Sequence, residues 1–198
     1  MITLGLGIVG AALFVVTFLI DGATRPGYNP VRQPVSALAL GSRGWIQTTN
    51  FVVCGLLISA SAIGIFETSG SMWLAGLIAV FGFALVASGV FPMDPMRGYP
   101  PGTTDETPKT TSTTHKRHDR AGIVVFTSLP AAAVAAAVTL ESTPWRILSA
   151  MTAVGLVALF VLFGTAWEAD SPRAGLIQRL AIITGWPWLA LLCWHLMP

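Results

Sequence analysis

Three short segments of this chain repeat one pattern, in which an acidic residue is followed by an arginine and then by a glycine. They are residues 21–27, 94–98 and 170–175, and the two tyrosines of the chain, Tyr28 and Tyr99, directly follow the glycine in the first two segments. An aspartate can hold such an arginine by an ion pair, and a guanidinium group binds phosphate or carboxylate through two parallel hydrogen bonds. The pattern therefore predicts a headgroup site built from three arginines or, as the alternative, interfacial turns that the charges merely fix.

The first hypothesis makes the protein a binder of a membrane lipid headgroup or of a small amphiphile. Three arginines on one face of the bundle would surround the headgroup, with the tyrosines beside them. The predicted ligand-binding residues are Asp21, Arg25, Tyr28, Arg97, Tyr99 and Arg173.

A second group of reactive side chains lies where His115 and His118 precede Asp119. Imidazole and carboxylate groups transfer protons near neutral pH, so together with Asp94 and Asp21 they could serve an enzyme that acts on a lipid-borne substrate. The two histidines could also bind a divalent metal, but the basic side chains of the same segment would repel a cation. A basic helix start that touches lipid phosphates explains the segment equally well.

The alternative function is therefore a membrane-embedded enzyme, and the sequence leaves the choice between binder and enzyme open. Its predicted catalytic residues are Asp94, His118 and Asp119. We predict no metal site and no cofactor. His195 lies on the other side of the predicted bundle and cannot join the histidine cluster.

These loops must be positioned by membrane-spanning helices, because apolar stretches separate them. Each stretch is near the roughly 20 residues that cross a bilayer at about 1.5 Å per residue. The predicted spans are residues 2–20, 46–66, 72–91, 121–140, 145–167 and 176–196. The sequence thus predicts an all-α membrane protein, a six-transmembrane-helix bundle with proline-rich cytoplasmic loops and a single domain over residues 1–198.

The distribution of cationic residues decides the predicted orientation. Ten of the 11 Lys and Arg residues lie in the first, third and fifth loops, and only Arg146 lies on the other side. Cationic side chains near helix ends resist translocation, so the basic side is predicted to be cytoplasmic and both termini to lie outside. We expect a multi-pass protein of the plasma (inner) membrane.

Composition disfavours several other classes of protein. Hydrophobic residues make up 54% of the chain and charged residues 10%, whereas a water-soluble domain carries about 25% charged residues. Ion-coupled transporters usually hold a charged residue near the middle of the bilayer, and none of the predicted spans does, so coupled transport is disfavoured. No phosphate-binding glycine loop or nucleic-acid surface is present, so we predict no nucleic-acid partner. The oligomeric state cannot be read from the sequence.

The first loop is rich in proline but also apolar. Pro26, Pro30 and Pro34 exclude a regular helix there, whereas Ser36 could cap a short one that ends at Gly41. We expect this loop to lie in the membrane interface or between helices, where it would cover a cavity from the cytoplasmic side.

Several segments together resemble one protein family. They are residues 21–47, 90–95 and 98–102, the pair His118-Asp119 and the pair Trp145-Arg146. On these segments the chain resembles the bacterial and archaeal membrane proteins grouped as domain of unknown function 998, over nearly its whole length. The resemblance implies a multi-span integral membrane protein, and it transfers no catalytic residue because the family has no assigned activity.

Overall fold

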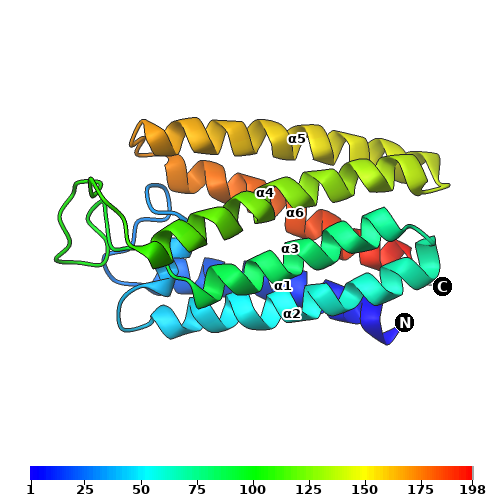
Figure 1. Cartoon of the computed structure of the whole chain (residues 1–198), viewed down its shortest axis with the longest axis horizontal. Helices are drawn as coiled ribbons and strands as arrows, with labels where there is room; N and C mark the ends of the chain where they lie inside the picture. Colours follow the sequence, from blue (N-terminus) through cyan, green and yellow to red (C-terminus); the bar gives the residue numbers. More distant parts are fainter. Residues whose placement is uncertain (198) are drawn as a thin grey trace.

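The computed structural model describes residues 1–197, is all-α, and contains six helices that are long and apolar enough to cross a membrane. The helices are α1 (Ile2–Thr24), α2 (Gly44–Ser69), α3 (Met72–Val90), α4 (Thr113–Thr139), α5 (Thr143–Glu168) and α6 (Ala174–His195). Each helix packs against the next one along the chain, and α6 returns to pack against α1, so the contacts close a ring. Figure 1 shows the helices running side by side along the long axis of the molecule. The predicted six-helix membrane fold is confirmed.

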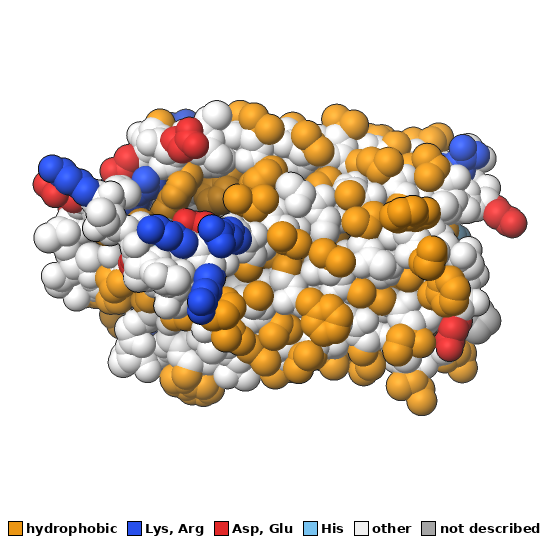
Figure 2. Space-filling view, in the orientation of Figure 1, with side chains coloured by type: hydrophobic (Ala, Val, Ile, Leu, Met, Phe, Trp, Pro, Cys, Tyr) orange, Lys and Arg blue, Asp and Glu red, His pale blue; other side chains and the backbone are white. Residues whose placement is uncertain are grey.

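The outer surface of this ring is apolar, as contact with lipid requires. Val9 and Val16 on α1 and Met151 and Val154 on α5 are all more than half exposed. Figure 2 shows hydrophobic side chains over the helical part of the molecule and charged side chains gathered at its ends. An apolar surface of this extent would promote association in water. The chain is therefore a multi-pass membrane protein.

All helices except α3 begin or end outside the apolar stretches that predicted them. Hydropathy reports only the apolar run, whereas a helix continues until a cap or a proline stops it. Helix α4, for example, starts at a cap in which the Ser112 hydroxyl accepts a hydrogen bond from His115 N at 3.0 Å. The assignment of Arg179 to the fifth loop is wrong, because this residue lies within α6 and is buried.

Aromatic rings from several helices fill the middle of the ring. Trp186 of α6 stacks on Phe14 of α1, with ring centres 5.2 Å apart, and meets Phe81 of α3 edge-on at 4.9 Å. Helices α2 and α3 pack backbone to backbone, since a Cβ atom on Gly55 would lie 2.6 Å from the Gly82 carbonyl oxygen. Small residues let helix backbones approach in this way when lipid removes the hydrophobic driving force.

The termini and the first, third and fifth loops lie at opposite ends of the ring. Both termini lie at one end, and the first, third and fifth loops gather at the other, which we call the loop end (Figure 1). The first loop contains a short 3-10 helix, η1 (Val35–Ala39), which follows Pro34. A short helix was predicted in this segment. It ends at Ala39 rather than at Gly41, and the predicted cap is wrong, because Pro34 precedes the helix and Ser36 lies within it.

Candidate functional site

Arg25 is buried at the loop end and binds groups of the protein itself. Its guanidinium forms a buried ion pair with Asp21, as predicted from their spacing. Its other acceptors are the carbonyl oxygens of Leu38 (2.7 Å), Leu40 (3.0 Å) and Arg43 (2.8 Å) and the Tyr99 hydroxyl (3.2 Å). Arg25 therefore ties the first loop to the end of α1 and to the third loop.

Arg179 holds the same first loop against α6. Its guanidinium donates hydrogen bonds to the carbonyl oxygens of Pro30 at 2.5 Å and Gln33 at 2.8 Å, and also to the Tyr28 hydroxyl. This close approach requires Gly175, because a Cβ atom there would collide with the carbonyl oxygens of Gln33 and Pro30. The sequence pattern predicted Arg173 as a binding residue, but Arg179, six residues later, is the arginine that contacts Tyr28.

Tyr28 and Tyr99 connect these two arginines. Their rings meet edge-on with centres 5.3 Å apart. Burial raises the pKa of Tyr28 to about 12, and the nearby Arg179 guanidinium only partly opposes this shift. We refer to the following residues as the collar: Asp21, Arg25, Tyr28, Tyr99 and Arg179.

Arg97 and Arg173, the other two predicted arginines, have different surroundings. Arg97 forms an ion pair with Asp170 at 3.1 Å, donates to the Trp167 carbonyl oxygen at 2.7 Å, and lies over the Trp167 ring at 3.8 Å from its centre. The ion pair expected between Arg97 and Asp94 is therefore wrong, because Arg97 binds the acid of the third segment. The Arg173 side chain is exposed and makes no hydrogen bond or ion pair with the described residues.

Asp94 binds the residue that caps the start of α4, and it does not pair with an arginine among residues 1–197. Its carboxylate accepts hydrogen bonds from Ser112 N at 2.7 Å and from the Ser112 hydroxyl at 2.6 Å. Burial raises the pKa of Asp94, but the hydrogen bonds from Ser112 outweigh this effect and lower the pKa below its ordinary value. Asp94 N donates in turn to His115 Nδ1 at 2.9 Å, and His115 Nε2 lies 3.3 Å from the Asp119 carboxylate.

His118 faces the interior of the bundle. It is 7% exposed, and its Nδ1 atom lies 3.1 Å from the Ser88 carbonyl oxygen and 2.8 Å from that of Phe91. Within residues 1–197, no hydrogen bond joins its ring to a carboxylate. The structure thus places Asp94, His118 and Asp119 along one end of α4, but it does not connect them through His118.

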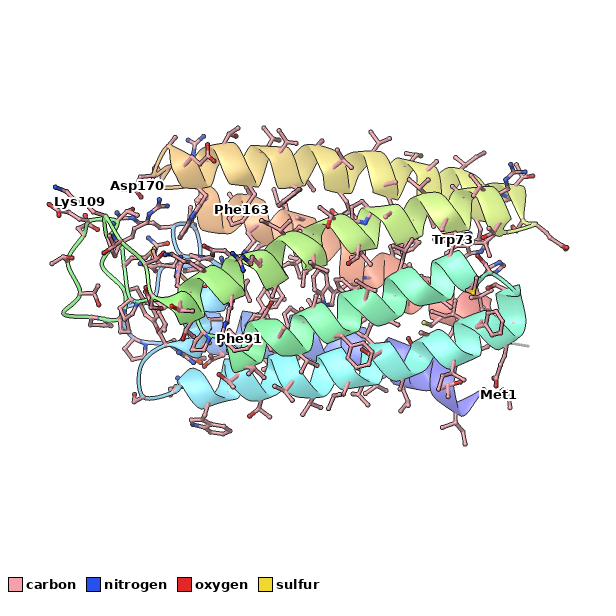
Figure 3. The ribbon with its side chains drawn as sticks, viewed as in Figure 1. Met1, Trp73, Phe91, Lys109, Phe163 and Asp170 are labelled. Atoms are coloured by element: carbon pink, nitrogen blue, oxygen red, sulfur yellow. The ribbon has the colours of Figure 1, made fainter. Side chains whose placement is uncertain are left out.

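A cleft of about 370 Å³ lies between α4 and α5 at the loop end. Figure 2 shows this face of the molecule hollowed close to the end where Lys and Arg side chains gather. Phe126 of α4 stacks on Phe160 of α5 in its wall, with ring centres 5.5 Å apart. Phe163 points from α5 toward α4 (Figure 3). The polar residues in the wall are Ser36, His115, His118, Asp119, Glu168 and Gln178.

A smaller chamber of about 30 Å³ continues from this cleft into the bundle. Both cavities share His118, Gln178 and Ser36, and the chamber reaches Trp186. Gln178 Oε1 accepts a hydrogen bond from Val35 N at 2.7 Å, so α6 holds η1 in place beside the cavity. The first loop therefore contributes to a cavity wall, as expected from its apolar sequence.

Sequence reasoning missed the walls of this cleft. Phe160, Phe163 and Trp167 share one face of α5 with Gly164, and this spacing was a signal that could have predicted an aromatic wall. Gln178 had a weaker signal, a single amide next to Arg179 near the start of the predicted span over residues 176–196. Within residues 1–197, no group of three or more His, Cys, Asp or Glu side chains is arranged to hold a metal ion.

The chain belongs to the family described as protein of unknown function (DUF998), whose family model matches residues 8–195. The resemblance inferred from the sequence segments is thereby confirmed. No curated protein and no solved structure matches the chain significantly. Family membership supports a membrane protein and assigns no activity, so the function must be argued from the cleft and the collar.

Proposed function

We propose that this protein binds a membrane amphiphile in the cleft between α4 and α5. The observation that carries the proposal is a cavity of about 370 Å³ with aromatic walls and three buried polar side chains, His115, His118 and Gln178. Small-molecule sites are typically of a few hundred Å³, mostly apolar, with a few polar groups that fix orientation. A lipid-like molecule can enter such a cleft sideways, because α4 and α5 both face the membrane.

The position of the cleft along the bundle suggests how the amphiphile lies. The charged residues of the wall, Asp119 and Glu168, lie toward the loop end of α4 and α5, and Phe160 lies farther along α5. The polar end of the ligand would therefore lie at headgroup level, and its alkyl chain would follow Phe126 and Phe160 toward the hydrocarbon layer.

This placement differs from the headgroup site expected at three arginines. Arg25 and Arg97 use their donors for contacts within the protein, so a headgroup would have to break those hydrogen bonds. The collar supports the cleft instead, because Arg179 fixes the carbonyl oxygen of Gln33 next to Pro34, which lines the cleft. Arg173 would act only as an exposed cation that attracts anionic lipid.

An enzyme that acts on the bound amphiphile is the second candidate, and His118 in the cleft wall is the observation in its favour. A proton relay through Asp94 or Asp119 has no support, because Asp94 accepts hydrogen bonds from Ser112 and Asp119 pairs with His115. Binding without chemistry is therefore the function that the geometry supports best.

A test of binding follows from two glycines on α5. At Gly164, which lines the cleft, and at Gly155, which does not, an added Cβ atom meets nothing within 4 Å. Leucine at either position also favours the helix by up to about 1 kcal/mol relative to glycine. Gly164→Leu would therefore fill the cleft without disturbing the fold, and Gly155→Leu is the matched control.

The experiment uses the full chain in lipid nanodiscs and a photoreactive long-chain alcohol. We expect labelled peptides from the α4 and α5 walls in the unmodified protein and in Gly155→Leu, and at least a tenfold loss of label in Gly164→Leu. Equal labelling of Gly164→Leu and the unmodified protein would show that the cleft is not the site, and the proposal would be abandoned.

We also infer that the loop end faces the cytoplasm of the plasma membrane, because it carries ten of the 11 Lys and Arg residues. Cysteine labelling can test this orientation, because the native cysteines, Cys54 and Cys193, are buried and should react little with a maleimide. An impermeant maleimide should label Glu141→Cys in intact cells and Lys109→Cys only after permeabilisation. The reverse pattern would invert the orientation.

A further inference from the structure

The surroundings of His118 identify which ring nitrogen is protonated. Nδ1 lies within 3.1 Å of the Ser88 and Phe91 carbonyl oxygens, which only accept hydrogen bonds, so we assign its proton to Nδ1. No carboxylate of the described chain hydrogen-bonds the ring, and a neutral imidazole of this tautomer presents its lone pair at Nε2. His118 therefore offers the cleft a hydrogen-bond acceptor at Nε2.

Gln178 offers hydrogen-bond donors, whereas His118 offers an acceptor. Its side chain faces Val35 N, which is a donor, so the atom at 2.7 Å must be the oxygen Oε1. The amide NH2 group then has no partner among residues 1–197, although Gln178 is only 5% exposed and lines both the cleft and the inner chamber. Gln178 therefore presents hydrogen-bond donors to the same space as His118.

Trp186 adds a further donor at the inner end of this space. Its Nε1 atom is buried and has no hydrogen-bond partner within the described residues. The side chain is 2% exposed and lines the inner chamber together with His118 and Gln178. Buried polar groups in proteins are normally hydrogen-bonded, so the buried Nε1 atom of Trp186, in a cavity that His118 and Gln178 also line, points to a ligand group that accepts from it.

We propose that the polar end of the amphiphile is an uncharged hydroxyl group, an inference that rests on the proposed function of the cleft. A hydroxyl donates one hydrogen bond and accepts two. The cavity offers the complementary set, an acceptor on His118 and donors on Gln178 and Trp186. The hydroxyl donates to His118 Nε2 and accepts from Gln178, and Trp186 Nε1 is a second donor at the inner end of the chamber.

Charged headgroups do not match this set. A carboxylate or phosphate would direct its negative charge at the lone pair of His118 Nε2, and the carboxylates of Asp119 and Glu168 also line the cleft. An ammonium group only donates, so it would leave the donors of Gln178 and Trp186 unpaired. A site built to hydrogen-bond a hydroxyl rejects analogues that leave its buried groups unpaired.

The experiment is a competition with the full chain in nanodiscs of phosphatidylcholine, in which a photoreactive long-chain alcohol labels the cleft. The competitors are an alcohol, a carboxylic acid, an amine and a phosphate of the same chain length. One hydrogen bond to a buried partner corresponds to about a tenfold change in affinity. We expect the alcohol to compete at about tenfold lower concentration than each of the others.

Two variants test the residues that make this selection. Gln178→Glu keeps an oxygen for Val35 N and removes the donor, and His118→Asn keeps a donor for the two carbonyl oxygens and removes Nε2. Each should lower the preference for the alcohol about tenfold, while Gly155→Leu retains it. If one variant does not fold, the other variant and the competition with unmodified protein still decide the question.

The outcomes separate this inference from the proposed function. If Gly164→Leu abolishes labelling but the four headgroups compete equally, or a charged one competes best, the hydroxyl inference is wrong and amphiphile binding stands. If Gly164→Leu is labelled like the unmodified protein, both are wrong. Preference for the alcohol that is lost in Gln178→Glu or His118→Asn supports the assignment.

Discussion

Replacement of Arg179 tests whether the collar holds the loop end together. In Arg179→Met, the Pro30 carbonyl oxygen loses its only hydrogen-bond partner among the described residues, and Gln33 O keeps only the 3.3 Å bond from Tyr28. A buried polar group left without its partner costs about 1–3 kcal/mol, but Pro30 is exposed, so its carbonyl oxygen can bind water instead. The buried contacts of Arg179 therefore predict a loss of about 1–3 kcal/mol in the free energy of unfolding. For a chain of this length, that loss corresponds to a decrease of roughly 2–12 °C in Tm.

Thermal unfolding followed by tryptophan fluorescence in detergent measures this difference. Arg173→Met is the matched control, because it removes the same charge near the start of α6 from an exposed side chain that makes no hydrogen bond or ion pair with the described residues. We expect the control to change the free energy of unfolding by less than about 0.5 kcal/mol. If both variants melt at the same temperature, the collar does not stabilise the loop end and the argument from its hydrogen bonds is refuted.

Three further predictions concern the other polar groups of the loop end. Asp21→Asn should destabilise the protein by about 3–5 kcal/mol in the same assay, because it leaves buried Arg25 without its carboxylate; an unchanged Tm would contradict this. Because the pKa of Asp94 is lowered in the folded state, its contribution is present above the ordinary pKa of about 3.9 and is lost as the pH falls through the folded value. Amides at the start of α4 should then lose protection in acid, measured as the exchange rate relative to the intrinsic rate at the same pH, and in Ser112→Ala they should be poorly protected already at neutral pH. In an absorbance titration, the tyrosine component near pH 12 should disappear in Tyr28→Phe; a component that remains at that pH would contradict this.

The number and type of helices could be predicted because they depend on local composition. An apolar stretch of about 20 residues forms a transmembrane helix, because a helix satisfies the backbone hydrogen bonds within the bilayer. The ends of helices could not be predicted as well, because they depend on caps and on what the helix meets outside the apolar layer. Helix α4 includes a basic, polar first part that hydropathy excludes, and its start is fixed by Ser112 and by Asp94 from the preceding loop.

The candidate site could be predicted only where its contacts are local. The ion pair of Asp21 and Arg25 joins residues four apart, and their spacing was sufficient to predict it. The pairing of Arg97 with Asp170 joins two different loops, and a repeated pattern could not predict that exchange of partners. His118 was expected to carry chemistry, but the cavity that gives it a role depends on how α5 packs beside α4.

Gln178 and Arg179 show how the collar and the cleft are connected. These adjacent residues on α6 bind the backbone of the first loop on both sides of Pro34, through Val35 N and the Gln33 carbonyl oxygen. Pro34 itself lines the cleft, so the contacts that stabilise the loop end also fix one wall of the cavity. Loss of Arg179 should therefore weaken both stability and binding, whereas Gly164→Leu fills the cleft from α5 without touching the first loop. An amphiphile bound at Gln178 would in turn stabilise the first loop, because the ligand binds the folded state and not the unfolded one.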